Sequence, residues 1–188
     1  ERLQLNVSYP DIARRIGEVC GKLLDREAER LARERLTPAA LAGQHRSDAA
    51  RSIWVVADAT GVGAPVCDLL RAELKATGIR LTAAFFTHGD KSSIGWGVRE
   101  ATVGKAYLVS RLQALIQAQR ILLPKTAEAE VLASELLNYE IRIDDDANLK
   151  AGAFKVGTHD DMATALGLSV IRDWPGVRKA ISIDGYTG

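Results

Sequence analysis

Long apolar runs are missing from this chain of 188 residues. No run approaches the roughly 20 apolar residues that cross a bilayer, so we expect no membrane span. No secretory signal pattern opens the sequence. The sequence also lacks an initiator Met, and we therefore expect that Glu1 is not the natural start of the gene product.

The chain also has few cysteines and almost no net charge. The two cysteines, Cys20 and Cys67, fall on apolar faces of predicted helices, which predicts buried thiols instead of a disulfide. The formal net charge is only +1, which excludes a uniformly basic nucleic-acid binder but permits a local basic patch. The composition, 47% apolar and 26% charged, is typical of a soluble globular protein, and the length predicts a single domain over residues 1–188.

Nucleotide-binding motifs are incomplete. Gly61 and Gly63 follow an apolar strand, but Val66 stands where a dinucleotide fingerprint needs its third Gly or Ala. The ribose-binding acid is also absent from the end of the next strand, 85–87. Gly104 and Lys105 lack the other residues of a phosphate-binding loop, so no ATPase motor is expected. A tight turn between strand and helix explains the glycines better, and nucleotide binding remains an alternative.

The pattern of strands and helices predicts an α/β fold. Alternating residues predict a strand at Arg2–Val7, and Ser8 with Asp11 forms the capping box of a long helix. Residues 25–50 are expected to be a helical or loop insertion. A strand at Ser52–Asp58, a helix ending at Gly78 and a strand at 79–87 predict a parallel unit, with the first strand buried on both faces.

The second half of the chain is predicted to contain further short elements. Four glycines in His88–Gly104 indicate a mobile loop over a site. The remaining expectations are a helix over 105–118 with Leu108, Leu112, Leu115 and Ile116 inward, a strand at 120–123, a helix from Thr126, a hairpin of 138–143 with 151–156 around Asp144–Asp146, a helix from Thr158 to about Ile171, and a tail over 177–188.

Two acidic positions could carry chemistry. Asp58 ends an apolar strand, where desolvation of its charge must be offset by a cation or by hydrogen bonds. Asp160 and Asp161 follow His159 at the start of the last helix; alternatively, Thr158 and Asp161 form an ordinary capping box. If these acids converge, they could bind one or two Mg²⁺ or Mn²⁺ ions and hydrolyse a phosphodiester.

Other acidic and histidine residues have simpler interpretations. The turn Asp144–Asp146 lacks the pattern of a calcium-binding loop and is expected to be a solvated hairpin turn. His45 and His88 have no partners at ligand spacing, so both are predicted to be ordinary surface or loop residues.

The sequence resembles the nuclease domain of tailed-bacteriophage terminase large subunits, the DNA-packaging enzymes. Two stretches carry the resemblance, Val56-Ala-Asp-Ala-Thr-Gly-Val-Gly-Ala-Pro-Val66-Cys-Asp-Leu-Leu70 and Gly157-Thr-His-Asp-Asp-Met-Ala-Thr-Ala-Leu166. Gly89-Asp-Lys91 and Lys105-Ala-Tyr-Leu-Val-Ser110 lie between them in the family's order, and coverage runs from about Leu3 to Ile171.

The resemblance implies an RNase H-like fold, with a mixed sheet flanked by helices, and a metal-dependent endonuclease that cuts concatemeric DNA. It assigns catalytic metal binding to Asp58 and to the pair Asp160 and Asp161, without deciding which of these two is the direct ligand, with His159 nearby. Lys91, Arg99 and Lys105 are then expected to contact phosphates. Double-stranded DNA, a portal protein and a small terminase subunit would be partners, in the cytoplasm of a bacterial host cell.

Two departures from the family pattern are visible. The ATPase motor domain is absent, and the family's first catalytic Asp lies on a strand that precedes the matched region. Glu1–Val7 would correspond to the family's third strand, so the first and second strands, which form the middle of its sheet, would be missing. The strand Ser52–Asp58 would then have an unpaired edge. We expect Arg2–Val7 to pair with that strand or across a homo-oligomer, and activity to be weak or lost. The alternative is a non-catalytic DNA-binding or assembly remnant of the fold.

Overall fold

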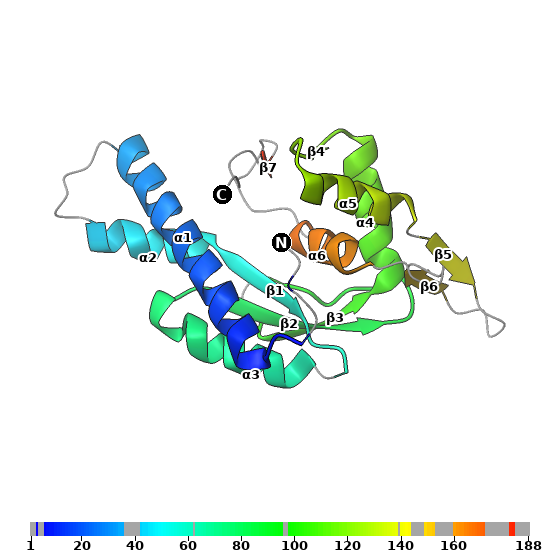
Figure 1. Ribbon diagram of the computed structural model, residues 1–188, viewed down its shortest axis with the longest axis horizontal. Helices are drawn as coiled ribbons and strands as arrows, with labels where there is room; N and C mark the ends of the chain where they lie inside the picture. The colour runs from blue at the N-terminus through cyan, green and yellow to red at the C-terminus, as the bar shows by residue number, and fades with distance from the viewer. Residues whose placement is uncertain are drawn as a thin grey trace. The chain divides into compact units, whose positions relative to one another are not determined.

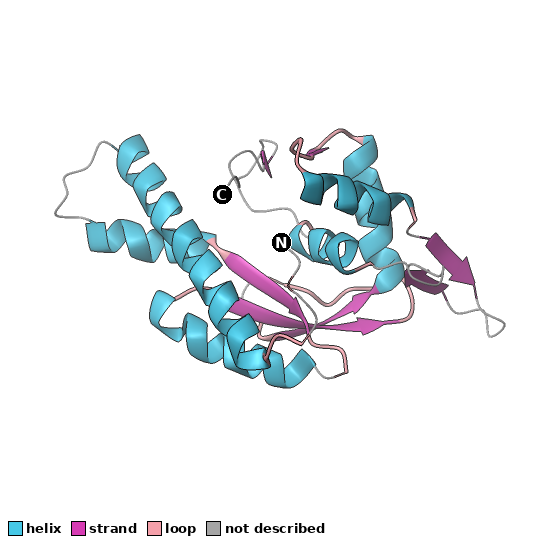
Figure 2. Ribbon diagram, in the orientation of Figure 1, coloured by secondary structure: helices cyan, strands magenta, loops and turns pink. Residues whose placement is uncertain are grey.

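The computed structural model describes residues 3, 6–35, 42–61, 63–95, 98–138, 140–143, 149–152, 160–171 and 181–182. The chain divides into two compact units. The N-terminal unit comprises Leu3–Phe85 and Ile94–Ala101, and the C-terminal unit comprises Glu1–Arg2, Phe86–Ser93 and Thr102–Gly188. Both units contain helices and strands (Figure 2). None of the described helices combines the length and the apolar character needed to span a bilayer.

The first helix of the N-terminal unit, α1 (Tyr9–Arg35), is 27 residues long. Ser8 caps its start as predicted, because the Asp11 amide donates to Ser8 Oγ at 3.3 Å. The Asp11 carboxylate accepts from the Ser8 hydroxyl at 2.5 Å, whereas in a standard capping box it accepts from the N-cap amide. The predicted strand at Arg2–Val7 falls mostly outside the described residues. Its pairing therefore stays a prediction, although Asn6, with φ 77°, lies in a turn.

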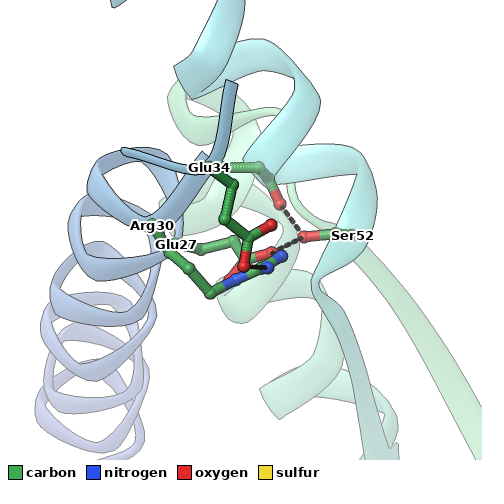
Figure 3. A network of polar contacts seen from close by, with 5 residues as sticks. Glu27, Arg30, Glu34 and Ser52 are labelled. Carbon is green, nitrogen blue, oxygen red and sulfur yellow. Dashed lines mark hydrogen bonds and ion pairs between the residues drawn. The ribbon is translucent and has the colours of Figure 1, made fainter. Parts of the chain in front are cut away.

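Helix α2 (Ala42–Ser52) packs against α1. The Arg30 guanidinium joins Glu27 and Glu34 on α1, with nitrogen–oxygen distances of 2.6–2.8 Å, and the Ser52 hydroxyl donates to Glu27 at 3.3 Å (Figure 3). The hydrogen bonds from Arg30 hold the pKa of the Glu27 carboxyl below its usual value. His45, predicted to be a surface residue, is only 4% exposed on α2; that prediction was wrong.

A parallel strand–helix–strand unit follows, as predicted. Strand β1 (Trp54–Asp58) leads to α3 (Gly63–Leu74) and the short helix η2 (Lys75–Thr77), and β2 (Arg80–Thr87) lies parallel to β1 (Figure 1). Gly78 ends η2 with φ 73°, the left-handed conformation that glycine adopts without strain. Buried residues of α1, α2, α3 and the strands form one core, which includes Ala13, Cys20, Leu24, Ala49, Cys67, Leu70, Leu74 and Leu81.

The sheet has the order β1-β2-β3, where β3 is Glu100–Gly104. Within the described part of the chain, β1 therefore has a neighbour on one side only, and its first four residues are half-buried. The prediction of a strand buried on both faces was wrong, because Trp54–Ala57 are only half-buried and Asp58 is exposed. Both cysteines are buried free thiols, as predicted, and burial raises the pKa of each.

The C-terminal unit is built mainly from helices. Its elements are α4 (Lys105–Gln117), β4 (Ile121–Leu122), α5 (Ala127–Leu137), β5 (Glu140–Ile143), β6 (Leu149–Gly152), α6 (Asp161–Ser169) and β7 (Ile181–Ser182). Helix α6 packs against α4 and α5. The predicted helix from Thr126 is confirmed, and Thr126 is its N-cap: the Thr126 hydroxyl accepts from the Ala129 amide at 3.3 Å. Strands β5 and β6 form the predicted antiparallel hairpin, but the second strand is Leu149–Gly152 instead of 151–156. Asp144–Asp146 lie outside the described residues.

Three expectations for this half need correction. The supposed mobile loop His88–Gly104 ends in β3, and the Ser93 amide donates to the Thr102 carbonyl at 2.9 Å. The alternation of exposed and buried residues in 100–103 is that of a strand, which the glycines upstream obscured. Ile116 is 41% exposed instead of inward. The supposed tail contributes β7, which pairs in parallel with β4.

Candidate metal-binding and DNA-binding site

Asp58 stands at the carboxyl end of β1 in the N-terminal unit, and it is exposed. The expectation of a carboxylate desolvated on a buried strand was therefore wrong. The backbone nevertheless holds Asp58 firmly. The Ala59 amide donates to the Ala84 carbonyl at 2.8 Å, and the Thr60 amide donates to Asp58 Oδ1 at 2.8 Å. This second bond is a local turn that orients the carboxylate.

The two glycines after Asp58 are required by the turn into α3. Gly61 has φ 64°, a conformation that side-chain-bearing residues rarely adopt. A Cβ at Gly63 would lie 2.5 Å from the Asp58 carbonyl oxygen, so only glycine fits without moving the backbone. The turn accounts for both glycines without a bound nucleotide.

Asp160 and Asp161 begin α6 in the C-terminal unit. Asp160 is the N-cap residue: its carbonyl accepts the Thr164 amide at 2.8 Å, but its half-buried side chain makes no capping hydrogen bond. Asp161 is the first helical residue and is exposed. The alternative capping box with Thr158 as N-cap was wrong, because the helix begins later. Thr158 and His159 themselves lie outside the described residues.

A buried carboxylate from another helix caps α6. Glu135, on α5, is 6% exposed, and its Oε2 accepts the Met162 amide at 2.8 Å and the Ala163 amide at 3.0 Å. Sequence reasoning missed this residue. The available signal was the single charged residue in the stretch Val131–Leu137, but its partner is 27 residues away in the sequence.

Helix α4 holds the rest of α6. A Cβ at Gly167 would lie 2.3 Å from a methyl carbon of Leu108, so the two helices approach closely at this glycine. At the far end, Arg111 Nε donates to the carbonyl of Val170, the C-cap residue, at 2.6 Å. Helix α6 thus receives an acid at its N-terminus and a base at its C-terminus, which matches the helix dipole.

Two of the three predicted phosphate-contacting residues come from one corner of the C-terminal unit. The Gly104 amide donates to the Lys91 carbonyl at 2.8 Å, and the Ala106 amide donates to the Gly89 carbonyl at 3.1 Å. These bonds tie the exposed Lys91 to the start of α4, where Lys105 stands. Lys105 Nζ lies 5.5 Å from the centre of the Phe86 ring, a cation–π distance.

Arg99, the third predicted contact, belongs to the N-terminal unit and is exposed. Its carbonyl accepts hydrogen bonds from the Ala83 amide at 2.9 Å and from Arg71 Nη2 at 3.3 Å, so its backbone is anchored beside β2.

The donor chemistry of the three acids suits a hard divalent cation. Carboxylate oxygens are the ligands that Mg²⁺ and Mn²⁺ prefer. Across the described ranges, no group of three or more His, Cys, Asp or Glu side chains is arranged to hold a metal. A joint site of Asp58 with the α6 acids therefore stays a prediction.

Comparison with known proteins identifies the family. A family model described as the terminase RNaseH-like domain matches residues 20–172. No curated protein and no solved structure matches the chain. The matched range includes β1 with Asp58, α6 with Asp160 and Asp161, and every basic residue discussed above. The chain therefore belongs to the family of terminase RNase H-like domains, the nuclease-type domains of DNA-packaging enzymes.

Proposed function

We propose that this chain is a metal-dependent endonuclease domain that cuts double-stranded DNA during packaging, with Asp58, Asp160 and Asp161 as metal ligands. One observation carries the proposal: the family match extends without a break over both acid-bearing elements. The exposure of Asp58 and Asp161 supports it further, because a ligand carboxylate must be reachable by the ion and by the substrate.

Two bound ions would activate a water molecule and stabilise the leaving oxygen of the phosphodiester. The chain's own contribution is orientation. The Thr60 amide holds the Asp58 carboxylate at one oxygen, and the N-terminus of α6 presents Asp160 and Asp161. We assign His159, next to these acids in sequence, to contact with the scissile phosphate.

Lys91, Lys105 and Arg99 would grip the DNA backbone. Contacts to phosphates position a duplex without reading its sequence, so binding should be insensitive to sequence and sensitive to salt. Other packaging proteins, such as a portal and a small terminase subunit, are the expected partners of the assembled enzyme.

The test is cleavage of plasmid DNA by the purified chain with Mn²⁺. Asp58→Asn and Asp160→Asn should each abolish cleavage while the variants still bind DNA. Asp68→Asn is the matched control, because Asp68 is an exposed acid on α3 whose carboxylate pairs with Arg71 at 2.7 Å. Cleavage that survives Asp58→Asn would contradict the proposal.

The rate should be low for these residues alone. The family resemblance assigns a further catalytic Asp to a strand preceding the matched region, so a longer chain that includes such a strand should cut faster. DNA binding without any cleavage by either chain would instead favour a non-catalytic DNA-binding or assembly role.

A further inference from the structure

The start of α6 has an unusual capping arrangement. The first amides of a helix have no partner within the helix. An Asp at the N-cap ordinarily satisfies one of them, because its carboxylate accepts from the second or third helical amide. Asp160 is the right residue type at that position, yet its side chain makes no such bond.

Glu135 occupies the two amides that Asp160 would otherwise cap. With Asp160 as N-cap, Met162 and Ala163 are the second and third helical residues, and both amides donate to Glu135 Oε2 at 2.8 and 3.0 Å. Glu135 is 6% exposed, so water does not compete strongly for these bonds. Its charge also lies at the positive end of the helix dipole.

We propose that Glu135 is a positioning residue for the candidate catalytic acids: by capping α6 from α5, it leaves the Asp160 carboxylate available to bind a metal ion. This inference rests on the proposed function, in which Asp160 and Asp161 are ligands. Without Glu135, the Asp160 side chain would turn back onto the Met162 and Ala163 amides and would be withdrawn from the ion.

The effect of the Glu135 charge can be separated from the effect of its two hydrogen bonds. A single oxygen of Glu135 accepts both amides. The carbonyl oxygen of a glutamine can therefore make the same two bonds, whereas alanine can make neither. Glu135→Gln should preserve the direction of the Asp160 carboxylate, and Glu135→Ala should not.

Mn²⁺ titration of the full chain by calorimetry, in the absence of DNA, tests the inference. Glu135→Ala should bind Mn²⁺ about 10-fold more weakly, the usual loss when a group that orients a metal ligand is removed. Glu135→Gln should stay within a few-fold of the unmodified chain. The double variant Glu135→Ala with Asp160→Asn should bind no more weakly than Asp160→Asn alone, because Glu135 acts through Asp160.

Arg111→Met is the matched structural control. It removes the side-chain donor from the opposite end of α6, at Val170, and leaves the N-terminal amides untouched. It should lower the melting temperature without changing Mn²⁺ affinity. Amide exchange at Met162 and Ala163 should accelerate in Glu135→Ala and remain slow in Glu135→Gln and Arg111→Met.

The possible failures are distinguishable. Unchanged Mn²⁺ affinity in Glu135→Ala, or an equal loss in Arg111→Met, would overturn the positioning role and leave the proposed function intact. A chain whose Mn²⁺ binding is absent, or is insensitive to Asp160→Asn, would overturn both. If Glu135→Ala does not fold, Glu135→Asp replaces it with the same expected loss, because its carboxylate is one methylene short of the two amides.

Discussion

The two acid-bearing regions of the molecule are built in opposite ways. Asp58 is oriented by residues a few positions away, namely Thr60 and the glycine turn that ends at Gly63. The acids of α6 depend on residues that are distant in sequence: Glu135 lies 27 and 28 residues from its two partners, and Arg111 lies 59 residues from Val170. A local motif thus holds one acid, and tertiary packing holds the others.

The largest effect on stability should come from a substitution in the glycine turn that follows Asp58. Gly63→Val places a side chain against the Asp58 carbonyl oxygen, which cannot move without disturbing β1. We expect a loss of about 3 kcal/mol in the free energy of unfolding, measured by urea denaturation. Gly21→Ala on α1 is the control, since nothing lies within 4 Å of its added Cβ, and it should stabilise by roughly 0.5–1 kcal/mol. Equal behaviour of the two variants would refute the account of the turn.

The second-largest effect should come from a substitution at the contact between α4 and α6. Gly167→Ala should cost about 2 kcal/mol of stability, because its Cβ would overlap Leu108. Leu108→Ala removes the overlapping atoms, so the double variant should lose less stability than the sum of the two single variants. A double-mutant cycle in thermal unfolding measures this coupling. Strict additivity would mean that the helices do not meet at these residues.

A smaller effect is expected at the C-terminus of α6. Arg111→Met keeps much of the aliphatic stem but loses the hydrogen bond to Val170, and we expect a loss of about 1 kcal/mol in unfolding free energy. Arg33→Met is the control: Arg33 is exposed on α1, and its replacement should change stability by less than roughly 0.5 kcal/mol. A similar loss of unfolding free energy in both variants would show that the hydrogen bond from Arg111 to Val170 has no particular role in stabilising α6.

The smallest effect concerns the helix that supplies Glu135. Thr126→Ala removes the N-cap of α5 and should cost roughly 0.5–1 kcal/mol of unfolding free energy. Thr126→Ser retains the hydroxyl and should remain close to the unmodified chain. Amide exchange at Ala129 reports the cap directly, and unchanged exchange in Thr126→Ala would show that the bond contributes nothing.

The same contrast explains what could be predicted from the sequence. The Ser8 cap, the helix that starts at Thr126 and the parallel β1–α3–β2 unit rest on patterns within a few residues, and each is confirmed. The exposure of Asp58 was mispredicted, because burial of a strand depends on which neighbours flank it. Glu135 was missed for the same reason: its role exists only once α5 and α6 are packed together.

Helix α4 has a consequence for how this domain can evolve. Its first residue, Lys105, lies in the same corner of the C-terminal unit as Lys91, and its later residue Leu108 packs against Gly167 of α6. A helix of 13 residues is a stiff rod of about 20 Å. Any substitution that tilts it displaces the lysine and the acid-bearing helix together. Under the proposed function, substitutions that tilt α4 would therefore change DNA affinity and cleavage rate together, whereas substitutions at Lys91, outside this helix, would change DNA affinity alone.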